Sequence, residues 1–114
     1  MNALRNRVQL IGHLGMDPEV KSFDNDRKLA KFSVATNEVY YTAKGDKKEE
    51  TQWHNIVMWG KTAEIAEKYL KKGQEVCVEG KLVNRIWETK EGEKRYITEV
   101  VVNELVMLGK KDAA

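Results

Sequence analysis

Hydrophobic and polar residues alternate over several segments of this chain, a pattern typical of strands that bury one face. The alternation predicts five strands, at residues 7–14, 29–37 with a continuation through 42, 51–61, 74–88 and 96–103. Residues 62–72 instead repeat apolar side chains at helical spacing, and Gly73 stands where a C-terminal cap would lie. Residues 16–28 hold Asp, Asn, Ser and the single proline, so we predict a loop there. The predicted order is three strands, one helix and two strands.

The segment 51–61, TQWHNIVMWGK, is predicted to be the central strand and carries two of the three tryptophans. Alternation puts two sets of side chains on opposite faces: Trp53, Asn55, Val57 and Trp59 on one, and His54, Ile56 and Met58 on the other. Both faces carry large apolar groups. One face should meet the core, so the other needs a further cover, either a second copy of the chain or a ligand.

We expect the face with His54, Ile56 and Met58 to be covered by other copies, as well as the outward side of residues 74–88 with Cys77. The competing interpretation is that the tryptophans are simply core residues.

Five strands with one helix between the third and fourth, and glycines inside or beside long strands, form the order of an OB-fold, a five-stranded Greek-key barrel. The predicted fold class is all-β with one helix. At 114 residues the chain has room for one domain. We place this domain at residues 1–109, followed by a short charged end at 110–114.

Composition narrows the possible chemistry. The net charge is only +2, so attraction to a polyanion would have to come from local patches. Cys77 is the single cysteine, and the two histidines have no ligand spacing around them, so we expect no internal disulfide and no metal site. His54 and Cys77 have no positioned catalytic partner, which predicts a subunit-contact or packing role for each, and we assign both to the subunit interface. Without a membrane-spanning run or a signal-peptide core, a cytoplasmic protein is expected.

Aromatic and basic residues gather where an OB-fold binds its ligands, across strands two and three and in the loops from one to two and from four to five. These residues are Tyr40, Trp53, Trp59, Trp87 and Arg95. Aromatic rings stack on any base, and Lys or Arg neutralises phosphates, so this pattern indicates single-stranded nucleic acid bound without sequence choice. Arg85 lies two residues before Trp87 on one strand face, which is the interleaving such a groove requires.

The chain also resembles a known family, the bacterial single-stranded DNA-binding proteins, over nearly its whole length. The segments that carry the resemblance stand in the family's order: VQLIGHLGMDPEV, FSVATNE, TQWHNIVMWGKTAEIAEKYLKKG, VEGKL and RYITEVVVNE. The resemblance implies a homotetramer of OB-folds that binds and protects single-stranded DNA in replication, recombination and repair, without catalysis or a cofactor. It also implies a bacterial protein of the cytoplasm, associated with the nucleoid.

Residue by residue, the resemblance places Trp53 and Trp87 on the family's base-stacking tryptophans. Trp59 stands where the family typically has Phe, and Tyr40 stands where it often has Trp. The basic positions that line the family's DNA path correspond to Lys61, Lys72, Arg85, Arg95 and Arg7.

Family members usually continue into a flexible tail whose acidic and apolar end recruits repair and replication enzymes. In this sequence Lys110 and Lys111 stand near the end, and their charge would oppose binding to a basic pocket. We therefore expect no enzyme partners that are recruited through a C-terminal tail.

Two other functions stay open from the residues alone. An OB module of this composition could bind RNA or a protein surface, because stacking does not distinguish ribose from deoxyribose. A small hydrolase would need a nucleophile with a base or a metal centre, and the sequence offers neither.

Overall fold

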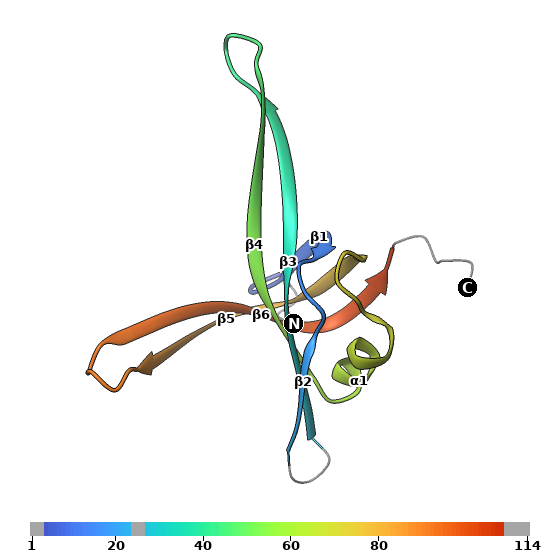
Figure 1. Ribbon diagram of the computed structural model, residues 1–114, viewed down its shortest axis with the longest axis vertical. Coiled ribbons are helices and arrows are strands. Elements are labelled where there is room, and N and C mark those ends of the chain that lie inside the picture. Colours follow the sequence, from blue (N-terminus) through green and yellow to red (C-terminus); the bar gives the residue numbers. More distant parts are fainter. Residues whose placement is uncertain (1–3, 24–26, 109–114) are drawn as a thin grey trace.

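The computed structural model describes residues 4–23 and 27–108, so the predicted charged end at 110–114 lies outside the described residues. The elements, in chain order, are β1 (Val8–Leu14), β2 (Glu19–Phe23), β3 (Arg27–Tyr41), β4 (Lys47–Trp59), α1 (Gly60–Tyr69), β5 (Glu75–Glu88) and β6 (Lys94–Met107). Figure 1 shows a small barrel from which long pairs of strands project in different directions.

Five of the strands close this barrel. The strand order in the sheet is β1-β5-β6-β4-β3-β2, and β1 pairs additionally with β3. That last pairing, His13 with Ala35 and Leu14 with Val34, joins the sheet into a ring. A mostly β structure with one helix between the third and fourth barrel strands confirms the predicted OB-fold.

A further strand, β2, lies outside the ring and corrects the loop predicted at residues 16–28. It pairs antiparallel with β3 from Glu19 opposite Lys31 to Phe23 opposite Arg27. Four of its five side chains are exposed, so it has almost no buried face to give the alternating pattern of a barrel strand. Backbone pairing to β3 makes this segment a strand.

The helix also lies earlier than the predicted range of 62–72. It begins at Gly60 directly after β4 and ends at Tyr69, and Leu70 is already extended. Gly73 is therefore not its cap, and its N–H instead donates to the Leu14 carbonyl at 2.8 Å. Ala63 and Ala66 face the barrel, where small side chains let the helix pack closely.

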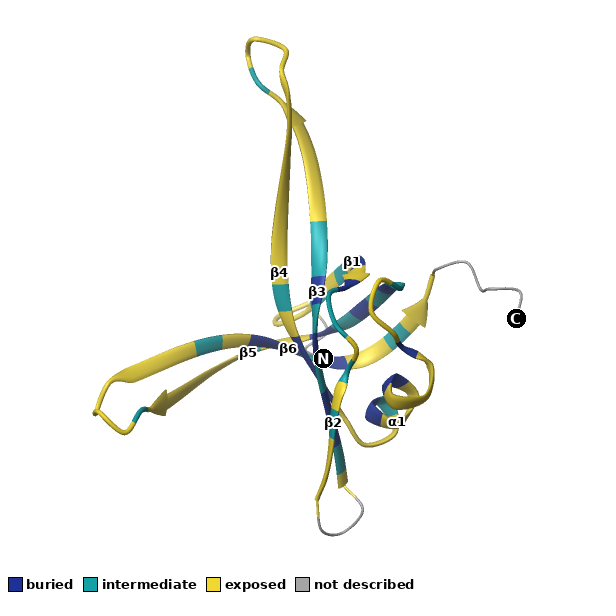
Figure 2. Cartoon of the chain, in the orientation of Figure 1, coloured by how far each residue is buried: buried dark blue, intermediate teal, exposed yellow. Residues whose placement is uncertain are grey.

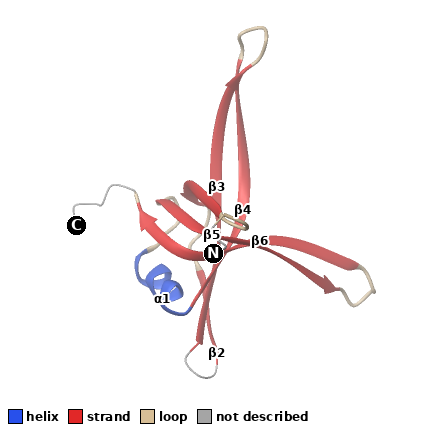
Figure 3. Cartoon of the chain, turned by 180° about the vertical axis from the view of Figure 1, so that it is seen from behind, coloured by secondary structure: helices blue, strands red, loops and turns tan. Residues whose placement is uncertain are grey.

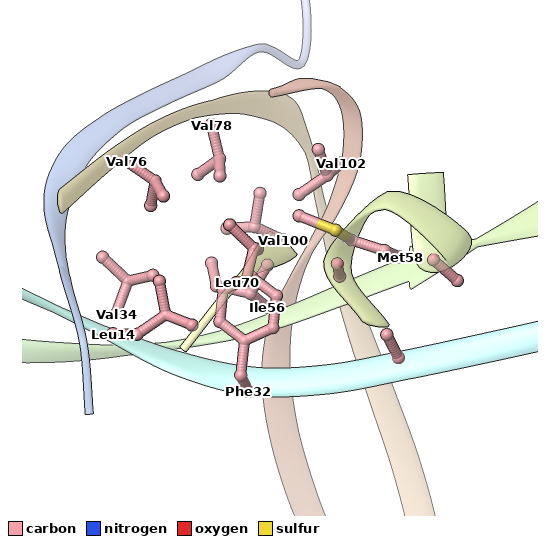
Figure 4. Packing of buried hydrophobic residues seen from close by; sticks show 13 residues of the cluster. Leu14, Phe32, Val34, Ile56, Met58, Leu70, Val76, Val78, Val100 and Val102 are labelled. Atoms are coloured by element: carbon pink, nitrogen blue, oxygen red, sulfur yellow. The ribbon is translucent and has the colours of Figure 1, made fainter. Parts of the chain in front are cut away.

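The core fills the barrel interior with one face of each barrel strand (Figure 4). Ile56 and Met58 lie at its centre with 1% and 0% of their surface exposed. The expectation that these two residues face another copy of the chain is therefore wrong. Ring closure decides which face of a strand is inside, and here it encloses this face of β4 although both faces are apolar.

Ring closure depends on close approach at Gly12. A Cβ atom at this position would lie 2.2 Å from the carbonyl oxygen of Ala35 and 2.8 Å from a methyl group of Val34. Any side chain would thus push β1 away from β3. Glycine is required because the opposing atom belongs to the backbone and cannot rotate aside.

Two strand pairs extend well beyond the core. The β3–β4 ladder continues to Tyr41 opposite Lys47, and the β5–β6 ladder continues to Glu88 opposite Lys94. Both project from the barrel, as Figure 1 and the reverse view in Figure 3 show. Their outer halves are exposed on both faces (Figure 2). We call these two projections the β3–β4 arm and the β5–β6 arm.

Candidate nucleic-acid interface

The three tryptophans lie on one continuous outer face of the sheet. Residues directly opposite each other in a ladder share a face. Trp53 and Asn55 lie on the same face of β4, and Asn55 is paired with Glu99 of β6. Glu99 in turn lies on the same face of β6 as Arg95, which is paired with Trp87 of β5. Trp53 and Trp87 therefore share one face of the sheet. Trp59 also belongs to this face by the two-residue alternation along β4. We call this surface the outer tryptophan face.

All three indoles are accessible there. The exposed fractions are 62% for Trp53, 52% for Trp87 and 39% for Trp59. The alternative that these tryptophans are core residues is therefore wrong. Large exposed aromatic side chains on one face are what a base-stacking surface requires.

The ring of Trp53 rests over Gly15, which lies just after β1. A Cβ atom on Gly15 would lie 2.3 Å from Trp53 Cζ3 and 2.9 Å from Ser33 Oγ. Glycine thus provides the space in which the indole lies against the barrel while its other side faces solvent.

Trp59 belongs to a cluster that the sequence analysis missed. Its ring centroid lies 6.2 Å from that of Phe23, with an angle of 30° between the planes. The Arg27 guanidinium carbon lies 5.2 Å from the centroid of the Trp59 ring. Phe23 and Arg27 are directly paired across β2 and β3, so recognising residues 16–28 as a strand pair would have brought them together.

Two arginines of the β5–β6 arm, Arg85 and Arg95, lie on the same face as these tryptophans. Arg85 Nη1 is 3.5 Å from Glu99 Oε1, and Glu99 is only 4% exposed. The positive charge of Arg85 therefore offsets the negative charge of this nearly buried carboxylate, which would otherwise repel phosphates from the outer tryptophan face. Arg95 lies opposite Trp87, and its guanidinium contacts exposed Glu93 at 3.2 Å.

Four other predicted DNA-binding residues lie elsewhere. Tyr40 pairs with Lys48, which puts it on the opposite face of the β3–β4 ladder from Trp53. The Arg7 side chain forms an ion pair with Glu79 across β1 and β5. Lys61 is exposed at the second residue of α1, and Lys72 is exposed in the connection after it. The backbone N–H of Lys72 donates to Asp17 Oδ1 at 2.8 Å.

The two predicted subunit-contact residues lie in different surroundings. His54 is half-buried, and its Nε2 lies 3.0 Å from Thr36 Oγ1. Cys77 points outward on β5, opposite Ile11 of β1 on one side and Val106 of β6 on the other. Ile11 and Val106 are both exposed, so these three residues form an apolar row across three strands of the barrel exterior.

One lysine of β3 is held by the helix. Lys28 Nζ donates to Glu67 Oε1 at 2.6 Å, and this hydrogen bond is the main cause that raises the pKa of Lys28 above its usual 10.5. The pair ties β3 to α1 on the side of the ladder opposite Arg27.

Among residues 4–23 and 27–108, no three His, Cys, Asp or Glu side chains converge as a metal site would require. No helix in the same ranges is long and apolar enough to cross a membrane.

Comparison with known proteins agrees with this geometry. Residues 5–108 match the model of the single-strand binding protein family. The chain is 46% identical over 109 residues to single-stranded DNA-binding protein 1 of Chlorobaculum tepidum. The aligned region covers 95% of this chain and 67% of that protein. It is 45% identical over 107 residues to single-stranded DNA-binding protein 1 of Xylella fastidiosa, covering 93% and 79% of the two chains.

A solved structure of similar fold is the Plasmodium falciparum SSB complex with ssDNA. Its TM-score is 0.86 at 34% sequence identity, and the match covers 96% of this chain and all of that chain.

Proposed function

The chain belongs to the single-strand binding protein family, and from that membership we propose that it holds single-stranded DNA along the outer tryptophan face. Proteins of this family bind single-stranded DNA and catalyse no reaction. In this chain the DNA would lie on the outer tryptophan face, where aromatic rings stack on bases and arginines neutralise phosphates. The observation that carries it is the exposure of Trp53, Trp59 and Trp87 on one register-linked face beside Arg85 and Arg95.

Base stacking supplies the sequence-independent part of this binding. Every base presents a flat π-face, and stacking on an aromatic side chain is worth about 1 to 3 kcal/mol per base by alanine substitution. Trp53 and Trp87 are more than half exposed already, so a base can stack on them without a rearrangement of the core. The guanidinium groups of Arg85 and Arg95 lie on the same face and can neutralise neighbouring phosphates.

Fluorescence titration with poly(dT) tests the proposed surface. Because all three tryptophans lie on the proposed ligand side, binding should quench most of the intrinsic tryptophan emission. Competition with a matched poly(rU) oligomer tests the nucleic acid. Equal affinity for both would favour a general single-strand binder, and quenching confined to a small part of the emission would contradict the proposed surface.

The same family membership supports a homotetramer. The row of Ile11, Cys77 and Val106 leaves apolar area on the outside of a closed barrel, and burial against another copy would remove it from water. His54 lies on the side of β4 opposite the outer tryptophan face and remains a proposed subunit-contact residue. Sedimentation at micromolar concentration should show one species heavier than a dimer, and a monomer would contradict the proposal.

In the cell, such a protein would cover single-stranded DNA exposed during replication, recombination and repair, in the cytoplasm close to the nucleoid. Two of the relatives above come from bacteria, which supports this setting. A fluorescent fusion should gather at foci when DNA damage exposes single strands. A uniform distribution before and after damage would contradict this role.

A further inference from the structure

Trp59 differs from the other two tryptophans because protein groups already occupy its ring. Phe23 is stacked beside it at 6.2 Å between centroids, and the Arg27 guanidinium lies 5.2 Å from its centroid. These contacts account for its lower exposure, 39% against 62% for Trp53. A base that uses this ring must therefore share it with Phe23 or displace Arg27.

We propose that Phe23, Arg27 and Trp59 form a further nucleotide subsite, in which a base replaces the Arg27 guanidinium on the indole and Arg27 binds the adjoining phosphate. This inference rests on the proposed function, because it extends the same DNA path. The subsite adds Phe23 and Arg27 to the proposed binding surface. It also includes a contact between Arg27 and the Trp59 ring that is already formed before DNA binds.

The chemistry of arginine suits both positions. A guanidinium is planar and weakly hydrated, so it stacks on an indole when no nucleic acid is present. The same group binds phosphate oxygens through two parallel N–H donors. Arg27 is exposed, so no buried contact holds it on the ring. A base offers a larger π-surface to Trp59, while the phosphate offers Arg27 a full negative charge.

The position of the cluster makes it a continuation of the path. In the strand order β5-β6-β4-β3-β2, Trp87 lies on the first strand of this series and Phe23 on the last. Lys21 of β2 is opposite Leu29, which is opposite Trp59, so a second exposed cation shares this face. The subsite thus extends the aromatic and basic surface from β4 across two further strands, β3 and β2.

The test is Arg27→Ala with Lys28→Ala as its matched control. Both substitutions remove one positive charge from adjacent positions, but Lys28 lies on the other face of β3 and pairs with Glu67. Binding of the full chain to a dT oligomer long enough to cover the barrel is measured at several salt concentrations. Arg27→Lys serves as a second variant that keeps the charge without the planar group.

We expect Arg27→Ala to weaken binding about fivefold to tenfold and to lower the salt slope by about 0.7, the value for one phosphate contact on a single strand. Lys28→Ala should leave both quantities near wild type, and Arg27→Lys should restore the slope. Phe23→Ala should weaken binding about fivefold or more without changing the slope, because it removes only stacking.

Equal behaviour of Arg27→Ala and Lys28→Ala would overturn the subsite. Tighter binding by Arg27→Ala would overturn it as well, since it would mean that Arg27 only blocks the ring. Either result, together with weaker binding by Trp53→Ala, leaves the proposed function intact. Failure of the wild-type protein to bind the oligomer would contradict the proposed function itself.

Discussion

Gly15→Ala should weaken DNA binding through Trp53 while leaving the fold in place. The added Cβ would lie 2.3 Å from Trp53 Cζ3, and ordinary contact begins near 3.4 Å, so the ring must move by about 1 Å. No positive φ is involved at Gly15, and the atoms met first belong to the side chains of Trp53 and Ser33. Since Trp53 is 62% exposed, the indole can swing outward at little cost to folding, below about 1 kcal/mol.

The effect on binding has an upper limit. Stacking on one aromatic residue contributes about 1 to 3 kcal/mol per base, so displacing Trp53 cannot cost more than Trp53→Ala itself. We expect a partial loss, about 1 kcal/mol, because the ring moves but remains on the surface. Fluorescence titration with poly(dT) gives the affinity, and a thermal melt followed by circular dichroism shows whether the fold is intact.

A double-mutant cycle decides whether Gly15 acts through Trp53. If it does, the Gly15→Ala/Trp53→Ala double variant should bind with the affinity of Trp53→Ala alone, because no ring remains to be displaced. Additive losses would refute this reasoning. Wild-type affinity in Gly15→Ala, with the fold retained, would also refute it, since the resting position of the ring would then be irrelevant to binding.

Further predictions concern separate parts of the molecule. Trp87→Ala should weaken poly(dT) binding by about 1 to 3 kcal/mol, and unchanged affinity in a folded variant would remove it from the path. Arg85→Ala should lower the salt slope and expose the charge of Glu99, so adding Glu99→Gln should recover part of the lost affinity; no recovery would argue against a masking role. Gly12→Ala should lower the melting temperature, in contrast to Gly15→Ala, because its Cβ would lie 2.2 Å from a backbone oxygen. Ile11→Glu should shift sedimentation towards smaller species, and an unchanged profile would place the subunit contact elsewhere.

The sequence was sufficient for the five barrel strands and for their order around the helix, because each of these strands buries a face and so alternates. It was insufficient for β2, whose side chains are mostly exposed and which is defined by pairing with β3. The same limit hid the Trp59 cluster. Two of its residues, Phe23 and Arg27, lie within residues 16–28, the segment that was predicted to be a loop.

Alternation also could not say which face of β4 is inside. It separated Ile56 and Met58 correctly from the tryptophans, but both sets are apolar, and only ring closure distinguishes them. Tyr40 illustrates a different limit. Its aromatic character suggested a place with the tryptophans, whereas unbroken pairing along β3 and β4 puts it on the other face of the ladder from Trp53. The family resemblance indicated an aromatic DNA-binding residue at position 40, but it does not indicate on which face of the β3–β4 ladder that residue lies.

The unbroken register of the β3–β4 arm restricts how its length can change in evolution or by design. Pairing runs without a bulge from Leu29 opposite Trp59 to Tyr41 opposite Lys47, and the arm beyond the barrel contains no core. Inserting one residue into each strand at the base of the arm would reverse the face of every side chain out to the tip. Inserting two into each strand would keep every face and add about 7 Å of reach. Arms of different length should therefore differ by whole two-residue steps per strand, and grafted sequences should be chosen in the same steps.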